Sequence, residues 1–401
     1  MTHVPLRVEP LDGAITGVAV HGLDLAAPPH AGSAEWQELA AAFTQHGMLL
    51  VRTARGGSAT PAQVQAFYTS MHAALGLREV PSHRKAGVGS SGGRGELSDN
   101  LRGAAFPEAL GTNVLGNVPE GLDGWHGLTG LLQPASWWER ESVQYHHDGS
   151  FSAPALVSAV EEEHDGAMTT VRDAPPMLLQ MYCVDAPPEG GGELGGGRVV
   201  YKAGATLLLS TTHAFAAAPS AVAERARRMT AVYTKGFGNV AEGEYPRMAP
   251  SGLRPLAPAA PDTVSADARY AYSTGQPVMV HPLVLDHPDT GRPYVFVHTV
   301  CLDHLEEDGV GALSWDESME FLDSILDPAL GDTIVVNWEP GDLCFWDNRT
   351  MLHSVSPTAV YEERWPGRRL MMRTAMAEQG FSPFTTVQGG TAGEAAEQAR
   401  L

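Results

Sequence analysis

Short runs of β-forming residues separated by turn signals dominate the C-terminal part of the chain. From residue 277 onward, runs rich in valine, isoleucine and aromatic residues alternate with turn-forming segments such as 287–292 and 339–342. Glycine, proline and aspartate in these segments favour tight turns. Strands this short and this closely spaced predict an antiparallel barrel or sandwich. A helix expected at 316–326, with acidic residues in its first turn, is the one clear interruption.

The N-terminal part predicts elements that would flank this β structure. Residues 6–25 contain β-branched pieces broken by glycine and aspartate, which indicates strands with tight turns. A helix is expected next, because Ser33 can cap its start and Gly47 can end it, and a short buried strand follows at 48–53. The predicted fold class is therefore mainly β with flanking helices. Two further helices are expected at 206–218 and 220–229.

The length and composition favour one folded unit. The chain has 401 residues, more than a usual domain, yet β-rich barrels and sandwiches with long loops reach this size. We expect a single domain over residues 1–380 and a tail over 381–401. The segment 79–142, rich in Gly, Pro and Ser, is expected to be irregular and to cover the substrate. The six glycines of 187–197 indicate a flexible hairpin or lid, or equally a plain linker.

Charge and cysteine content exclude several classes of partner. The net charge is −21, with only 26 Lys and Arg, so nucleic acid is not expected as a partner or substrate. Only three cysteines occur, far apart in sequence, which argues against a disulfide framework and against thiolate zinc. No signal peptide or membrane-length apolar run is visible, and a cytoplasmic protein without a membrane partner is expected. Homo-oligomer formation stays open.

A His-x-Asp motif at His146 and Asp148 is the first candidate metal site. In an extended strand, residues two apart point to the same side, so both side chains can bind one ion. Two histidines and one carboxylate on one face suit non-haem iron, which needs open positions for dioxygen and a chelating co-substrate. A second His-x-Asp, at His287 and Asp289, is expected to form a surface hairpin turn instead.

The residues around this motif have expected orientations as well. Tyr145 and Phe151 would line the metal with aromatic surface and keep bulk water away. His147 would point away from the metal, either packed or facing solvent, with a substrate contact as the alternative.

The remote ligand is expected in residues 338–355. This segment predicts a turn, a strand through Trp346, a second turn, and a strand that carries His353. A lone strand histidine is more often a buried core residue, but its place in this array favours a metal ligand.

Two arginines twenty residues further on predict an anion site. Arg369 and Arg373 alternate onto one face of a strand, and a buried guanidinium needs an anion. A 2-oxoglutarate carboxylate would accept two parallel hydrogen bonds from it, whereas an internal ion pair is the alternative.

The chain resembles the taurine dioxygenase and 2,4-dichlorophenoxyacetate dioxygenase family in four motifs that occur in the same order. The N-terminal ITGVAVHGLDL and HGMLLVR are similar to the opening of that family too, so the resemblance covers nearly the whole chain. It implies a double-stranded β-helix, a jelly-roll barrel with the metal at its mouth. The motifs are YHHDGSF, HPLVLDHPDTGR, GDLCFWDNRTMLHS and RRLMMRTAM.

The same resemblance implies roles for individual residues. His146, Asp148 and His353 match the iron ligands, and Arg373 matches the arginine that holds the C5 carboxylate of 2-oxoglutarate, with Arg369 assisting. Thr206 matches a threonine that also contacts this co-substrate. Family members place that threonine directly after a Gly-Gly pair, whereas GELGGGRVVYKAGA intervenes here. The inserted segment, with NRTMLHSV, is similar to xanthine dioxygenases.

The implied reaction is hydroxylation of a small polar or anionic substrate. Iron(II), 2-oxoglutarate and dioxygen would be required, with decarboxylation of 2-oxoglutarate to succinate and CO2. A xanthine-type purine hydroxylase would use the same chemistry. Asp148 argues against the related halogenases, in which this carboxylate is lost.

Two rival functions come from other classes. The same ligand types also occur at catalytic zinc sites of hydrolases, but the paired arginines and the lack of an obvious general base argue against one here. A non-catalytic jelly-roll binding domain is disfavoured because the triad of metal ligands, His146, Asp148 and His353, is complete.

Overall fold

The structure is a computed structural model of the chain, and the account below covers only the residues whose placement it describes. Most of the segment 79–142, Phe151 and residues 388–401 lie outside them. The described residues are 6–25, 27–30, 32–52, 59–77, 106, 109, 112–118, 122, 124–128, 143–148, 160–164, 167–171, 176–187, 190–233, 247–256, 278–357, 368–375 and 385–387.

The largest sheet has seven strands and collects segments from both ends of the chain. All neighbours in it are antiparallel except β2 and β3, which are parallel. In spatial order its strands are β1 (Arg7–Pro10), β2 (Val18–His21), β3 (Met48–Val51), β18 (Leu343–Asp347), β7 (Leu178–Asp185), β20 (Arg369–Ala375) and β4 (Thr112–Asn117).

A three-stranded sheet faces this large sheet, and a five-stranded sheet extends the structure. The three-stranded sheet has the order β17 (Ile334–Val336), β10 (Thr206–Ser210) and β19 (Met351–Val355). The five-stranded sheet has the order β16 (Gly311–Ala312), β15 (His304–Glu307), β11 (Met229–Tyr233), β12 (Val278–Pro282) and β21 (Thr385–Val387). Separate two-stranded hairpins are β13 (Val284–Asp286) with β14 (Pro293–Val295), β5 (Val160–His164) with β6 (Ala167–Val171), and β8 (Gly191–Leu194) with β9 (Val199–Lys202).

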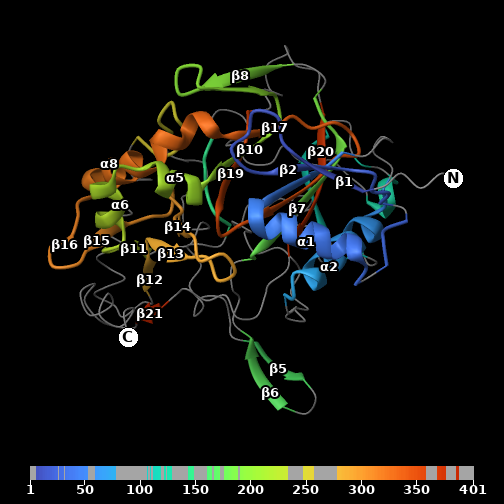
Figure 1. Cartoon of the computed structure of the whole chain (residues 1–401), viewed down its shortest axis with the longest axis horizontal. Coiled ribbons are helices and arrows are strands. Elements are labelled where there is room, and N and C mark those ends of the chain that lie inside the picture. Colours follow the sequence, from blue (N-terminus) through green and yellow to red (C-terminus); the bar gives the residue numbers. More distant parts are fainter. Residues whose placement is uncertain are drawn as a thin grey trace.

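Helices cover the outer sides of these sheets, as Figure 1 shows, with α1 and α2 on one side and α5, α6 and α8 on the other. The sequence sets their ends: α2 and α8 both begin with a capping box, at Thr60 and Ser314, and Gly47 ends α1 at φ 70°. The helices are α1 (Ala34–His46), α2 (Pro61–Ala74), α5 (Thr211–Ala217), α6 (Ser220–Ala226) and α8 (Trp315–Leu326), with short 3-10 helices η1 (Trp125–Gly127) and η3 (Asp327–Asp332).

Three apolar layers and a smaller apolar cluster around β4 result from this arrangement. One packs the large sheet against α1 and α2, and a second packs the three-stranded sheet against α5 and α8. The third lies between the large and the three-stranded sheets, where Leu208, Met181 and Met371 are buried together. In the described residues the sheets stack as a sandwich, as in a jelly roll, and do not close into a barrel. None of the described helices has the length and apolar character that a membrane crossing requires.

Most predicted elements are confirmed, including the first strands, α1, β3, α6, α8 and the C-terminal β-runs. Within the glycine-rich segment 187–197, Gly191–Leu194 form β8 of the β8–β9 hairpin. The helix predicted at 206–218 is wrong in its first part, because 206–210 form the central strand β10, buried on both faces between β17 and β19. A run buried on both faces has no period that separates helix from strand. Strand β4 lies within the segment 79–142, which was predicted to be irregular, and pairs with β20.

Candidate metal and co-substrate site

The three predicted metal ligands meet where two remote segments pair. Residues 143–148 form no regular strand, but His146 makes an isolated antiparallel bridge with His353 on β19. The two residues exchange backbone hydrogen bonds of 3.0 and 2.9 Å. The turn between β18 and β19 carries the chain from the large sheet to the three-stranded sheet. His353 pairs with Leu208, which is buried between these two sheets, so His353 faces the same layer.

The ligand atoms of the triad lie close enough to share one ion. Asp148 Oδ1 is 3.4 Å from His146 Nε2 and 3.7 Å from His353 Nε2, and the candidate ligand atoms all lie within 4.8 Å of one another. His146 Nδ1 is 2.9 Å from the carbonyl oxygen of Gln144, and a proton donated there leaves the Nε2 lone pair free for a metal. Two imidazoles and one carboxylate form the donor set that non-haem iron(II) sites use, so these residues fit such an ion.

The protonation states also suit a metal. Burial alone would raise the pKa of Asp148, but the positive charge of Arg373, helped by His353 and His146, holds it well below its usual value. Burial, with His146 close by, lowers the pKa of His353 to about 4. Asp148 is therefore ionised and His353 neutral near pH 7, the forms that coordinate metals.

The two oxygens of Asp148 face different partners. Oδ1 faces the two imidazoles, whereas Oδ2 accepts a hydrogen bond from Arg373 Nη2 in an ion pair. One oxygen is thus available to an ion while the other stays paired with the guanidinium.

The other predicted co-substrate residues lie on the facing sheets. Arg369 on β20 is buried, and its Nε donates to the carbonyl oxygen of Gly204 at 3.0 Å, two residues before Thr206. Met181 pairs opposite Arg373 in the sheet, and its sulfur lies 3.9 Å from Thr206 Oγ1. Each arginine therefore lies near Thr206 through a neighbour, Arg369 through Gly204 and Arg373 through Met181. Their contacts with 2-oxoglutarate stay predictions.

The structure changes the expectation for Tyr145 and agrees with that for His147. Tyr145 does not line the metal site: it is buried in the layer beneath the three-stranded sheet, and its hydroxyl lies 3.0 Å from that of Thr333. Its neighbours His146 and Asp148 point the other way, because successive side chains of an extended chain alternate. His147 points away from the metal as predicted: its ring is centred 5.0 Å from that of Phe296, and its Nδ1 lies 3.1 Å from the carbonyl oxygen of Val297.

Other rings take the place predicted for Tyr145. The ring of Trp346 is centred 5.2 Å from that of His353, and the ring of His298 is centred 5.3 Å from that of His146. Neither was predicted, because both belong to segments remote from residues 143–148. The alternation of side chains along 343–347 and 293–298 indicates which side chains share a face. Which face points toward the metal ligands follows only from the packing of the sheets.

The second His-x-Asp motif lies in the β13–β14 turn, as predicted, and is no part of the triad. His287 is nevertheless buried rather than at the surface: its Nε2 lies 3.1 Å from Asp347 Oδ2 and 3.0 Å from Arg349 Nη2. Asp289 is exposed. Asp347 and Arg349 pair with each other as well, so this cluster stabilises the turn between β18 and β19.

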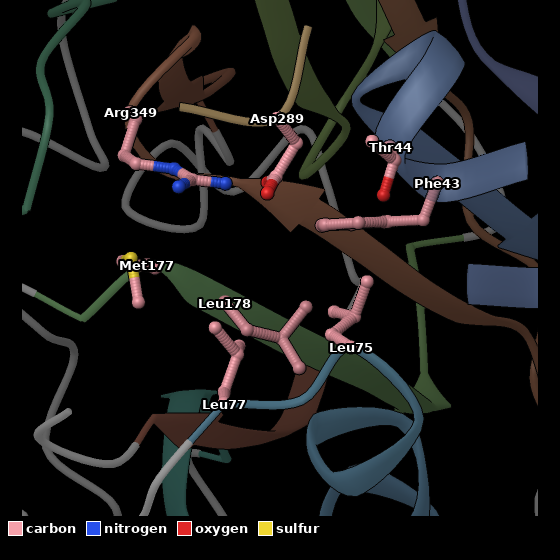
Figure 2. A pocket seen from close by; sticks show the side chains of 8 residues that line it. All are labelled: Phe43, Thr44, Leu75, Leu77, Met177, Leu178, Asp289 and Arg349. Carbon is pink, nitrogen blue, oxygen red and sulfur yellow. The ribbon is translucent and has the colours of Figure 1, made fainter. Parts of the chain in front are cut away.

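A small pocket lies beside that cluster and not at the triad. Figure 2 shows the charged ends of Arg349 and Asp289 on one side of it and Leu75, Leu77 and Leu178 on the other. No metal ligand lines it. We therefore place the candidate site by its ligand geometry.

Comparison with known proteins agrees with this geometry. Residues 7–375 match the family described as "Taurine catabolism dioxygenase TauD, TfdA family". An (S)-phenoxypropionate/alpha-ketoglutarate-dioxygenase of Sphingobium herbicidovorans is 32% identical over 114 residues, which cover 26% of this chain and only 37% of the relative's length.

Solved structures share the fold over nearly the whole chain. A taurine dioxygenase from Burkholderia xenovorans superposes with a TM-score of 0.51 and 18% identity, covering 98% of each chain. AAD-2, solved with Mn(II) and N-oxalylglycine, has a TM-score of 0.53 and 15% identity over 94% of this chain and 98% of its own. The predicted jelly-roll fold is confirmed, and so is the predicted family. The chain belongs to the TauD, TfdA family of dioxygenases.

Proposed function

We propose that the chain is an iron(II)- and 2-oxoglutarate-dependent dioxygenase that hydroxylates a small polar or anionic molecule. The observation that carries the proposal is the triad: two imidazole donors and one ionised carboxylate, all within 4.8 Å, between the sheets of a TauD-type jelly roll.

In this proposal His146, Asp148 and His353 hold the iron. The bound iron and 2-oxoglutarate supply the oxidising chemistry, in which 2-oxoglutarate and dioxygen give succinate, CO2 and one oxygen atom for the substrate. The chain's own residues bind and orient these partners. Trp346 and His298 place ring surface against the ligand imidazoles, which limits the access of water.

The co-substrate would be held by residues on the facing sheets. Arg373 and Arg369 supply guanidinium groups, and Thr206 supplies a hydroxyl, for the distal carboxylate of 2-oxoglutarate. Arg369 is the more deeply buried of the two arginines and lies beside Gly204, close in sequence to Thr206. Arg373 already binds a carboxylate, that of Asp148, so its guanidinium lies within reach of the metal ligands.

The substrate class is supported by the relatives and by charge. The phenoxypropionate and taurine dioxygenases are named for small molecules that carry an ionised acid group, a carboxylate or a sulfonate. The net charge of −21 disfavours a polyanionic polymer as substrate. A xanthine-type purine would be polar as well, and the same triad would serve it.

Anaerobic binding of iron(II) and 2-oxoglutarate tests the proposal. The wild-type protein is expected to develop a weak visible charge-transfer band, and His353→Ala is expected to lose it.

The two His-x-Asp motifs provide a matched pair of variants. Asp148→Asn removes the ligand carboxylate and should abolish the band, whereas Asp289→Asn changes the exposed aspartate of the turn and should keep it. Failure of the wild type to bind 2-oxoglutarate, or turnover with zinc but not iron, would contradict a dioxygenase. Succinate release with candidate substrates then identifies the substrate.

A further inference from the structure

We infer that Asn348 is a positioning residue that fixes the metal ligand Asp148 through the backbone of that ligand. The inference rests on the proposed function, because it assigns Asn348 a part in metal binding. Asn348 lies in the turn between β18 and β19 and is fully buried.

The side-chain amide of Asn348 forms hydrogen bonds with both backbone groups of Asp148. Its Oδ1 accepts the backbone N–H of Asp148 at 2.9 Å, and its Nδ2 donates to the carbonyl oxygen of the same residue at 2.8 Å. A second hydrogen bond from Nδ2 goes to the carbonyl oxygen of Pro176 at 2.8 Å. Both amide hydrogens are therefore used, and the side chain can take only this orientation.

Asp148 needs such a partner because of its place in the chain. The bridge between His146 and His353 is isolated, and Asp148 lies two residues beyond it. Its N–H and C=O bond to a side chain, where a residue inside a sheet would bond to a neighbouring strand. Asn348 thus sets the backbone from which the carboxylate of Asp148 reaches the imidazoles.

Asn348 is itself held in the same framework as the remote ligand. Its backbone N–H donates to the carbonyl oxygen of Met177 at 2.8 Å, at the start of the large sheet's β7. The turn that contains Asn348 leads directly into β19, which carries His353. One side chain therefore relates the position of Asp148 to the strand of the remote histidine, across 200 residues of sequence.

A purely structural role predicts a different result. If Asn348 only stabilised its turn, its loss would lower the unfolding midpoint and leave the metal affinity of the folded protein unchanged. A positioning role predicts weaker metal binding by protein that is still folded. Substitution of a residue that holds a metal ligand commonly lowers the affinity for the metal by about 10- to 100-fold.

Mn(II) binding followed by electron paramagnetic resonance separates these cases. Asn348→Ala removes all three hydrogen bonds. Asn348→Asp keeps the shape and the acceptor but loses the donors, and it places a carboxylate beside two carbonyl oxygens. Asn337→Ala is the matched control, because the Asn337 side chain also joins remote segments, accepting the N–H of Lys202 at 2.9 Å, away from the triad.

We expect Mn(II) dissociation constants about 10- to 100-fold higher for both Asn348 variants and an unchanged value for Asn337→Ala, each measured well below the unfolding midpoint. Wild-type affinity in a folded Asn348→Ala or Asn348→Asp would overturn the inference, and so would an equal loss in Asn337→Ala. A wild-type protein that binds no Mn(II) would instead count against the proposed function itself.

Discussion

At the scale of single residues, the two arginines of β20 have different surroundings and should differ in function. Arg373 pairs with Asp148, whereas Arg369 is buried beside Gly204. Replacing either with Gln should weaken 2-oxoglutarate binding by roughly 10- to 100-fold, the usual value of a charged hydrogen-bond pair. The measurement is the anaerobic dissociation constant of 2-oxoglutarate with iron(II) present.

The effects on metal binding should separate the two variants. Arg373→Gln also removes the ion pair of Asp148 and should change Mn(II) affinity, whereas Arg369→Gln should not. Arg368→Gln is the control, because Arg368 is the neighbouring arginine and pairs with Asp185 at 2.7 Å, at the surface. Normal 2-oxoglutarate affinity in both Arg369 and Arg373 variants would refute the predicted carboxylate site.

Single-residue chemistry was the part of the site that the sequence predicted best. His146 and Asp148 share a short His-x-Asp pattern, and His353 was predicted from its place in residues 338–355. The structure brings the three side chains together. Asn348 was missed, because an asparagine in an Asp-Asn-Arg turn indicates only a turn. Its contact with Asp148 joins residues 200 apart, and nothing local in the sequence encodes that.

At the scale of elements, β15 should make the stability of the fold depend on pH. His304 Nδ1 lies 2.7 Å from Asp303 Oδ2, and its Nε2 lies 3.3 Å from Glu306 Oε1. Burial alone would lower the pKa of His304, but hydrogen bonds to these two carboxylates raise it from 6.5 to about 9.

The direction of the effect follows from the raised pKa. The unfolded chain releases the His304 proton near pH 6.5, whereas the folded chain keeps it to about 9. The stabilisation, on the order of 3 kcal/mol, is therefore complete below pH 6.5 and is lost as the pH rises through 9. Urea unfolding of wild type and His304→Gln should show a large difference in free energy at pH 6 and a small one at pH 10. A constant difference across this range would contradict the prediction.

Elements buried on both sides limited what the sequence could predict at this scale. Residues 206–210 are aliphatic throughout their middle and are buried in the centre of a sheet, so their pattern fits a helix as well as a strand. Helix α8, which is buried on one face only and begins with Ser314 and Glu317 in a capping box, was predicted almost to the residue. Strand β4 was missed because it follows a long segment without periodicity, and among the described strands its one partner is β20.

At the scale of the whole molecule, a metal ion should stabilise the folded chain. The triad exists only in the folded state, since its members come from segments on either side of the large sheet's β7. A ligand at 100 times its dissociation constant adds about 2.7 kcal/mol, which for a chain of this size corresponds to a rise of about 3 °C in the unfolding midpoint.

Calorimetry with and without Mn(II) measures this rise. Asp148→Asn should show none, whereas Asp289→Asn should show the full rise. A rise of equal size in Asp148→Asn would mean that the ion binds elsewhere.

The ion pair between Arg373 and Asp148 also bears on the order of events after synthesis. Joining segments about 200 residues apart costs loop-closure entropy, which the packing of the sheets offsets, so the set of metal ligands is complete only when the sheets have packed. A chain that folds before it binds a metal has a carboxylate between its sheets and no ion to balance it. Arg373 provides that balance. The protein can thus complete its folding first and bind its metal afterwards.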